Sequence, residues 1–463
     1  MLSQEERRKL DEISKKVLDL GENTSVDTSL AAVVKDGVAF HHAGLRYSHR
    51  KLIEDEFRKN VIKVVCCTPT LAAGVNLPAR RVVVASLYRY EPEHGYVKIS
   101  VMEYKQMAGR AGRPKYDPYG ESIIIVNHPE DIVDALERYV NGEPEELSSG
   151  LASQRALRRH VLAAIASGYS ETFDDLMRFF ERTFYGIQHG SSAVERAVDP
   201  IVAYLKLNDL VRERKGKLRA TPLGRKINEL YVDPETGVLF KEVLSAKPSV
   251  EDPLPYLHLV CLSPDMVLLS MRSSEAESLL ERAEEEELFV PLPSNYNLMY
   301  DYLRALKTAL MLCDWIEEVP EDRIEKVYKA HPGDVYAVVE SAEWLVYSCS
   351  QIAKLLELKE HREFLDVLRL RVKYGVKEEL LKLVEIPGIG RVRARSLWKH
   401  GYRSVDDLRK ASLKRLVRVP KIGVEVAKAI LSYVGREVGE SELREVEEKP
   451  KKRTILDYAE KRR

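Results

Sequence analysis

Four short apolar runs, separated by helical patterns, dominate the first third of this sequence. They lie at residues 38–40, 62–66, 81–87 and 122–126. Short apolar runs that alternate with helices predict parallel strands in a sheet covered on both faces, because the connecting helices pack on the sheet. We therefore expect an α/β domain over residues 1–148, followed by a mainly α-helical remainder.

The length of 463 residues allows several hydrophobic cores, and the pattern after the first domain changes three times. Residues 149–246 are helical and end in a hairpin-like stretch, which suggests a winged helix. Residues 247–375 predict a helical bundle. Residues 376–437 are basic and contain an internal repeat. Residues 438–463 are apolar-poor and mixed in charge, so we expect a mobile tail.

Composition limits the function classes. The 73 Lys and Arg residues balance the 73 Asp and Glu residues, so any nucleic-acid signal must be local. The five cysteines form no CxxC pair and are odd in number, which argues against a zinc knuckle and a disulfide framework. We expect buried thiols in a reducing cytoplasmic setting. The apolar runs are far shorter than the roughly 18 residues of a membrane span, so we expect no membrane contact.

The strongest chemical signal is the stretch Gln106-Met-Ala-Gly109-Arg110-Ala-Gly112-Arg113. Arg110 and Arg113 are three residues apart, which predicts that they share one face of a short helix. Two guanidinium groups on one face can bind separate oxygens of a transferring γ-phosphoryl group, as arginine fingers do. The alternative is a surface helix with solvated arginines, but Gly109 and Gly112 would weaken such a helix.

A second phosphate-type signal follows the predicted strand 62–66, in the stretch Thr68-Pro-Thr70-Leu-Ala-Ala-Gly74-Val-Asn76. A helix that starts after a parallel strand presents free N–H groups to an anion. Thr68 and Thr70 could add hydroxyl donors to a nucleic-acid phosphate, and Gly74 and Asn76 would lie on the nucleotide side. The alternative is ordinary helix capping by threonine.

The basic segment contains Pro387-Gly-Ile-Gly390 and, later, Pro420-Lys-Ile-Gly423. Between Glu385 and Glu437, 13 Arg or Lys residues face 5 Asp or Glu residues, a local net charge of +8. The paired motifs look like the turns of a helix-hairpin-helix DNA-binding domain, where glycine lets the backbone approach phosphate. The alternative is a helical protein-interaction module. The candidate DNA contacts are Gly388, Gly390, Arg391, Arg393, Arg395, Lys421 and Gly423.

These motifs, together with residues 37–45, closely resemble motifs of the second RecA-like lobe in superfamily 2 helicases of the Ski-two-like branch. The order of lobe, winged helix, bundle and helix-hairpin-helix domain is similar to that of the archaeal DNA repair helicases called the helicase 308 family. Further similar patterns in the middle domains are Thr221-Pro-Leu-Gly224, Tyr231-Val-Asp-Pro234, Pro332-Gly-Asp334 and Ala342-Glu-Trp344-Leu345.

The resemblance implies roles for the nucleotide side of the chain. Arg110 and Arg113 would reach the γ-phosphate of ATP held by another lobe, and Gln106 would couple nucleotide to DNA. Gly74 and Asn76 would lie at that interface. ATP and Mg²⁺ would bind only when this other lobe is supplied, because the sequence contains no GxxxxGK[ST] phosphate loop and no strand ending in an Asp-Glu pair.

The resemblance also implies DNA contacts. His42 lies in the first motif, and the polar stretch from Arg89 and Tyr90 to Lys98 suggests a hairpin that wedges duplex strands apart or, alternatively, a simple exposed connection. Trp344, on a helix predicted over 334–356, resembles an aromatic residue that stacks on a base. Without the resemblance, it would be assigned to the core. The tail faintly resembles a sliding-clamp-binding peptide, although a frayed terminal helix is the favoured interpretation. A sliding clamp and a single-strand-binding protein are further candidate partners.

Three functions remain open at this level. The first is the C-terminal part of an ATP-dependent 3′–5′ DNA helicase that acts on forks in repair and replication restart, together with a separate N-terminal lobe. The second is a non-enzymatic DNA-binding fragment or regulator. The third is part of an RNA helicase, which the helix-hairpin-helix repeat disfavours. In each DNA case we expect the chain alone to bind single-stranded and forked DNA without hydrolysing ATP.

Overall fold

The computed structural model describes residues 2–21, 24–69, 77–91, 95–113, 117–436, 439 and 442. Clustering of contacts divides the chain into two compact units. The first contains Met1–Pro234 and Glu321–Ala337, and the second contains Glu235–Pro320 and Val338–Arg463. The described residues are mostly helical with small two-stranded sheets, so the expectation of an α/β start and a mainly α-helical remainder is met at this level. The tail from residue 443 lies outside the described residues.

The first unit begins with two helices whose start points are set by local hydrogen bonds. α1 (Gln4–Leu20) is capped by Ser3, and α2 (Ser25–Val34) is capped by Thr24. In both, an acidic side chain three residues later bonds back to the cap, which satisfies N–H groups that a helix start leaves open. Apolar residues of α1 and α2 share one core with β1 (Val38–His41) and α3 (Tyr47–Arg58).

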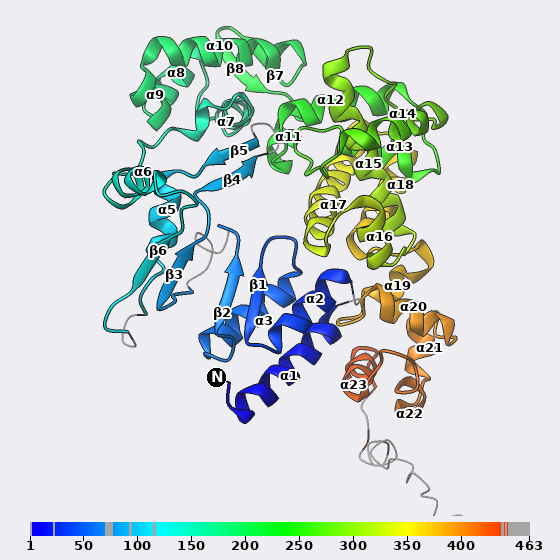
Figure 1. Ribbon diagram of the computed structural model, residues 1–463. Helices are drawn as coiled ribbons and strands as arrows, with labels where there is room; N and C mark the ends of the chain where they lie inside the picture. The colour runs from blue at the N-terminus through cyan, green and yellow to red at the C-terminus, as the bar shows by residue number, and fades with distance from the viewer. Residues whose placement is uncertain are drawn as a thin grey trace, which may run out of the picture. The chain divides into compact units, whose positions relative to one another are not determined.

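The four predicted apolar runs contain four short strands that form two parallel pairs (Figure 1). β1 pairs with β2 (Val64–Cys67), and β3 (Arg81–Val84) pairs with β6 (Glu121–Ile124). The expectation that both faces are covered is not met by the described residues. Val64, Val83 and Ile123 are 51, 50 and 40 % exposed, because only the alternate side chains of each strand point into the two cores of this part.

The polar stretch between β3 and the arginine motif forms an antiparallel hairpin of β4 (Tyr88–Glu91) and β5 (Gly95–Lys98). The predicted hairpin is therefore present, although residues 92–94 at its tip lie outside the described residues. It leads into α5 (Val101–Ala108), which is capped by Ser100 through a reciprocal bond with Glu103.

Helices and one further hairpin complete the first stretch of this unit. The hairpin pairs β7 (Val211–Arg214) with β8 (Lys217–Ala220) around Gly216, as the sequence predicted. The remaining elements are α6 (Asp131–Asp134), the π-helix η1 (Ala135–Val140), the 3₁₀-helix η2 (Gly150–Ala152), α7 (Gln154–Ala166), α8 (Phe173–Glu181), α9 (Phe184–His189), α10 (Ser191–Leu207), α11 (Pro222–Leu230) and α16 (Glu321–Tyr328).

The Thr221-Pro-Leu-Gly224 pattern is explained by the junction between β8 and α11. The Thr221 hydroxyl accepts a hydrogen bond from the Gly224 N–H at 3.1 Å and donates one to the carbonyl of Asp209 at 2.7 Å. A Cβ at position 224 would lie 2.1 Å from the carbonyl oxygen of Leu210. Only glycine therefore allows α11 to start this close to the preceding chain.

The second unit is helical. Its basic C-terminal segment forms a separate apolar core into which Ile389 and Ile422, the third residues of the two repeated motifs, are buried. The elements are α13 (Pro253–Cys261), η3 (Ser273–Glu275), α14 (Ala276–Glu285), α15 (Tyr296–Ile316), α18 (Lys359–Tyr374), η4 (Glu378–Leu380), α19 (Leu381–Val384), α20 (Arg391–Lys399), α21 (Val405–Arg409), α22 (Leu413–Leu416) and α23 (Val424–Tyr433). Two helices span the unit boundaries, α12 (Pro234–Ala246) and α17 (Pro332–Leu355).

Candidate functional site

The arginine motif does not form the predicted helix face. α5 ends at Ala108, and Gly109 is its C-cap, so Gln106 lies on the helix whereas Arg110 and Arg113 follow it in a loop. The loop is fixed by a parallel bridge between Ala111 and Ala79. The prediction was wrong because α5 ends before Arg110, and the left-handed backbone of Gly112, with φ of 93°, then prevents the chain from continuing as a helix to Arg113.

Hydrogen bonds on both sides of Ala79 hold this arginine loop. The Ala79 N–H donates to the carbonyl of Arg110 at 2.9 Å, and the Gly112 N–H donates to the carbonyl of Ala79 at 2.7 Å. Ala79 lies two residues before β3. The loop therefore has a defined place beside the start of a parallel strand, which is a rigid support for two partly buried arginines.

Arg113 is held by a carboxylate. Its Nε and one Nη atom lie 2.8 and 2.9 Å from the two carboxylate oxygens of Asp117, and its backbone N–H also donates to Asp117 at 3.0 Å. Hydrogen bonding from the Arg113 side chain is the main reason why the pKa of Asp117 lies below its ordinary value. The Arg113 side chain is 36 % exposed, so an incoming phosphate would compete with Asp117 for the same guanidinium group.

The threonine motif is only partly described. Thr68 is exposed after the end of β2, and its N–H donates to the carbonyl of His41 at 3.2 Å. This bond joins the ends of β1 and β2. Thr70, Gly74 and Asn76 lie outside the described residues.

His42 is half-buried at the end of β1. Its ring stacks on Phe40 with 5.7 Å between centroids, and its Nδ1 accepts a hydrogen bond from the Gly44 N–H at 3.1 Å. The centre of the His331 ring lies 6.1 Å from the centre of the His42 ring, in an edge-to-face arrangement. Burial, followed by the nearby His331, lowers the pKa of His42. At neutral pH this site therefore presents a neutral imidazole rather than a cation for phosphate.

Near His42, the segment 321–337 docks on the α/β part of the first unit. Arg46 donates to both carboxylate oxygens of Glu321, and Ser25 donates from its N–H and its hydroxyl to Glu325 at 3.2 and 2.7 Å. The Gly333 N–H donates to the carbonyl of Gly44 at 2.7 Å. We name this set of contacts the Glu321 clasp. It was not predicted, because no local pattern in one sequence connects Arg46 with Glu321.

The β4–β5 hairpin is tied to α5. Arg89 of the hairpin pairs with Glu103, and Lys98 pairs with Asp134 at 2.9 Å. Arg89 is exposed, and the side chain of Tyr90 lies outside the described part. The hairpin therefore shares a support with Gln106, which is exposed one turn after Glu103 on the same helix.

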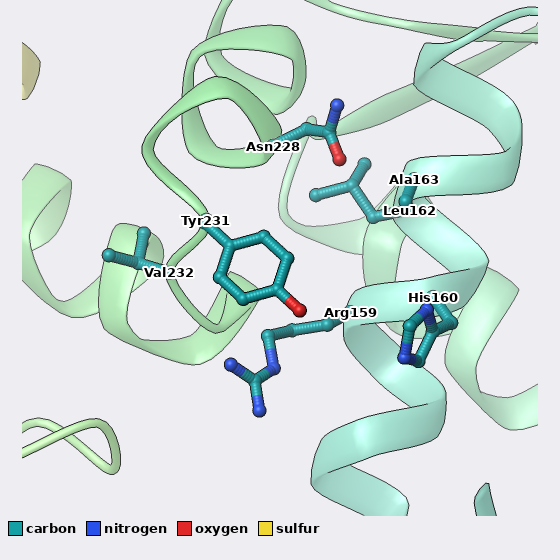
Figure 2. A pocket seen from close by; sticks show the side chains of 7 residues that line it. All are labelled: Arg159, His160, Leu162, Ala163, Asn228, Tyr231 and Val232. Atoms are coloured by element: carbon teal, nitrogen blue, oxygen red, sulfur yellow. The ribbon is translucent and has the colours of Figure 1, made fainter.

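A small pocket lies beside the Tyr231-Val-Asp-Pro234 pattern (Figure 2). The Arg159 guanidinium lies over the Tyr231 ring, 5.5 Å from its centre. The buried carboxylate of Asp233 accepts a hydrogen bond from Nε of Arg158 at 2.8 Å. The pattern therefore joins α7 to the end of α11, and it leaves the Tyr231 ring exposed at the surface.

Trp344 lies half-buried on α17, within the predicted helix. Tyr347, one turn later, is 37 % exposed, and the Arg369 guanidinium from α18 lies 4.6 Å from its ring centre. Arg369 also bonds to Glu343 at 2.7 Å. Aromatic rings and arginine planes are the groups on which bases stack. The spacing of Tyr347 from Trp344 could have indicated it, whereas Arg369 comes from another helix and could not be found.

The repeated hairpins have matching geometry. The second residue of each motif is left-handed, with φ of 81° at Gly388 and 67° at Lys421. α20 and α23 then begin at Gly390 and Gly423, neither of which contributes a side-chain cap. Both helix starts therefore present N–H groups of the kind that bind phosphate. All four residues are exposed.

Two arginines that were expected to contact DNA bind other residues of the second unit. Arg391 is 9 % exposed, lies 4.4 Å from the centre of the Trp315 ring and donates to the carbonyl of Val319. Arg395 donates to the carboxylate of Glu318 at 2.6 and 2.7 Å, which raises its pKa. These contacts fix α20 to the end of α15, so their geometry does not favour phosphate binding.

No group of three or more His, Cys, Asp or Glu side chains in the described part of the chain could hold a metal ion. Among the helices in these ranges, none is both long enough and apolar enough to cross a bilayer.

Comparison with protein families matches four stretches of the chain in succession. They are the helicase conserved C-terminal domain over residues 14–115, a helix-turn-helix domain over 120–212, domain 4 of archaeal helicases over 254–375, and a SAM-like helix-hairpin-helix tandem over 379–434.

Curated relatives match almost the whole chain. The ATP-dependent DNA helicase Hel308 of Pyrococcus horikoshii is 40 % identical over 99 % of this chain and 62 % of its own length. The proteins of the same name from Pyrococcus abyssi and Caldivirga maquilingensis are each 41 % identical, over 94 and 90 % of this chain and 60 and 58 % of their own lengths. The chain thus spans about three fifths of these relatives. The chain is homologous to a C-terminal portion of the archaeal Hel308 DNA helicases.

Proposed function

We propose that this chain is the DNA-handling part of an ATP-dependent DNA helicase, which works with a separate ATP-binding lobe. The observation that carries the proposal is the 40 % identity over 99 % of the chain to a protein named as an ATP-dependent DNA helicase. In this proposal the α/β part of the first unit is the second RecA-like lobe, and residues 149–246 form a winged helix. The substrates are single-stranded and forked DNA, and the motor moves 3′–5′ on forks during repair and replication restart.

Arg110 and Arg113 act on the nucleotide. Bound ATP supplies the γ-phosphoryl group whose transfer to water drives the motor, and Mg²⁺ held by the other lobe neutralises its charge. The role of this chain is to present two permanently charged guanidinium groups from a fixed loop. Support comes from the paired hydrogen bonds to Ala79, which leave this loop little freedom. Asp117 keeps Arg113 in place until a phosphate replaces it. In this proposal Gln106 couples nucleotide to DNA, and Gly74 and Asn76 take part in the ATP interface.

DNA is bound at three places in this proposal. The helix-hairpin-helix turns bind the backbone through Gly388, Gly390, Lys421 and Gly423. Trp344 stacks on a base, with Tyr347 and Arg369 beside it. The β4–β5 hairpin, which carries Arg89 and Tyr90, separates the strands, and Thr68, Thr70 and His42 lie along the path of one strand. Base stacking contributes about 1–3 kcal/mol and is independent of sequence, which suits a translocating protein.

The test is reconstitution. The chain is mixed with the ATP-binding lobe of a homologous archaeal helicase, and hydrolysis of ATP is measured with and without single-stranded DNA. We expect no hydrolysis by the chain alone and DNA-stimulated hydrolysis by the mixture. Arg110→Ala should reduce this rate by about 10³-fold or more, as the loss of an arginine finger does. Arg80→Ala is the matched control, because Arg80 is an exposed arginine close to the same loop and outside the motif.

The outcomes separate the alternatives. DNA binding without hydrolysis in any mixture would favour a non-enzymatic DNA-binding role. Hydrolysis that is stimulated equally by RNA forks, in competition with DNA forks, would favour an RNA helicase. A chain that binds no nucleic acid would refute the proposed function in every form.

A further inference from the structure

One side chain joins the two hairpin turns of the helix-hairpin-helix region. Arg393, in the first turn of α20, donates from Nη1 to the carbonyl oxygen of Gly388 at 2.8 Å. Its Nε donates to the carbonyl oxygen of Lys421 at 3.2 Å. Gly388 and Lys421 are the second, left-handed residues of the two Pro-x-Ile-Gly motifs. The same guanidinium group therefore binds the equivalent carbonyl in both repeats.

A second donor on α20 strengthens the link. The Ser396 hydroxyl donates to the carbonyl of Pro420 at 2.9 Å. Ser396 follows Arg393 by three residues, so both lie on one face of the helix. The second turn is thus bound at two consecutive carbonyls, Pro420 and Lys421. The positions that correspond to these donors in the second repeat are Val426 and Ala429, so only the first repeat provides the link.

Arg393 connects the two turns that lead directly into α20 and α23. Immediately after each bonded carbonyl, the chain enters the helix start at Gly390 or Gly423, and these starts have no side-chain cap. Their N–H groups are the phosphate-facing groups of the proposed DNA site. A guanidinium group that binds both turns sets the distance between the two helix starts, whereas the point charge of a lysine cannot reach two carbonyls in this planar arrangement.

We propose that Arg393 is a positioning residue, which holds the two helix starts at a fixed separation so that they bind one nucleic-acid backbone together. This inference rests on the DNA-binding function proposed above and deepens it. It replaces a direct Arg393–phosphate contact with an indirect role. The two roles differ in one respect that can be measured: a phosphate contact needs only the positive charge, whereas the positioning role needs the two-armed shape of the side chain.

The first experiment measures binding of the full chain to a labelled DNA fork by fluorescence anisotropy, over a series of salt concentrations. Arg393→Lys and Arg393→Gln should both weaken binding about tenfold, because either loses the two hydrogen bonds. Lys428→Gln is the matched control. Lys428 lies on α23 and pairs with Glu425, so its replacement removes one charge from the same region without touching the turns. It should change binding about twofold or less. An Arg393→Lys chain that binds like the wild type would overturn the proposal.

The second experiment uses a neutral substitution. Ser396→Ala removes the bond to Pro420 and leaves the charge of the chain unchanged, so it should weaken binding about fivefold. It should also reduce the slope of log affinity against log salt by about 0.7–0.9, the value for one lost phosphate contact. Partial unfolding would instead lower the fraction of protein that can bind DNA, without changing the slope of log affinity against log salt.

The results remain interpretable if the Arg393 variants do not fold, since Ser396→Ala then decides. If Ser396→Ala binds DNA with the affinity and the salt dependence of the wild type, the positioning role is refuted, but the DNA-binding function is not. A wild-type chain that binds no DNA would instead refute the DNA-binding function and, with it, this role.

Discussion

Arg46 and Glu321 form a buried two-point ion pair, although 275 positions separate them in the sequence. The Arg46 side chain is 9 % exposed and that of Glu321 is 1 % exposed, so neither charge is well solvated. Each therefore depends on the other. This pair is the centre of the Glu321 clasp, which makes residues 321–337 part of the first unit.

Breaking the pair from one side should be costly. Glu321→Gln leaves a buried guanidinium group without its counter-charge, and we expect a loss of about 3–5 kcal/mol in the stability of the first unit. The double variant Arg46→Met with Glu321→Leu should lose less, because no charge is then left alone. Urea unfolding, combined with hydrogen exchange over residues 321–337, measures both effects. Lys9→Gln, at an exposed pair with Glu5, is the control and should change little. Equal losses in the single and double variants would contradict this explanation.

Asp117 should weaken the binding of a phosphate group to Arg113, because both bind the same guanidinium group. Asp117→Asn removes the charge that holds the guanidinium group, so in the reconstituted ATPase the ATP concentration for half-maximal rate should fall. The change should be at most about fivefold, since the Arg113 side chain is partly exposed and solvent screens part of its interaction with Asp117. The maximal rate should be retained, in contrast to Arg113→Ala, which should abolish it. Asp134→Asn, at the exposed pair with Lys98, is a suitable control. A large loss of maximal rate in Asp117→Asn would assign Asp117 a role in the reaction itself.

His258 should make the second unit sensitive to acid. Burial lowers the pKa of His258 to about 4, from an ordinary value of 6.5. Between these two pH values the unfolded chain binds more protons than the folded chain, so stability is complete above pH 6.5 and falls as the pH is lowered toward 4. At roughly 1.4 kcal/mol for each pH unit, the loss is about 3 kcal/mol.

The three tryptophans of the chain, Trp315, Trp344 and Trp398, all lie in the second unit. Their fluorescence during urea unfolding therefore reports on this unit across the pH range. His258→Phe should flatten the dependence on pH, whereas His400→Gln, at an exposed histidine, should leave it as in the wild type. An unchanged slope in His258→Phe would mean that another group causes the acid sensitivity.

Gly224 should tolerate no side chain. A Cβ there would lie 2.1 Å from the carbonyl oxygen of Leu210, so Gly224→Ala must push α11 away from β7. We expect a loss of about 1–3 kcal/mol, measured by thermal unfolding with circular dichroism. Gly150→Ala is the control, because its Cβ would meet no atom within 4 Å. Equal stability of the two variants would show that the backbone around Leu210 relaxes freely.

Local patterns predicted much of the fold. The strands of the first unit, the β4–β5 hairpin, the helix that carries Trp344 and the repeated hairpin turns all follow from runs of a few residues, since neighbouring residues alone determine them. The arginine motif shows where this reasoning fails. Its spacing suggested a helix face, but the helix ends at Ala108, the left-handed Gly112 follows, and pairing of Ala111 with Ala79 fixes the loop.

Partners that are distant in the sequence could not be predicted. Arg391, Arg393 and Arg395 are alternate residues of one basic stretch, so the sequence predicts a DNA contact for all three alike. The structure distinguishes them, because Arg391 stacks on Trp315, Arg395 pairs with Glu318, and Arg393 binds two turns. Such differences depend on which distant segments are in contact in the folded chain, and a single sequence does not predict these contacts.

The two units are interleaved in the sequence, and this order affects how the chain folds during translation. The first unit takes residues 1–234 and then 321–337, so its docking segment emerges only after more than eighty residues of the second unit have been synthesised. The contact between Arg46 and Glu321 therefore cannot form until Glu321 leaves the exit tunnel. Contacts this far apart close slowly, so a pause in translation beyond residue 337 would give the first unit time to complete its folding before the helical segments that follow.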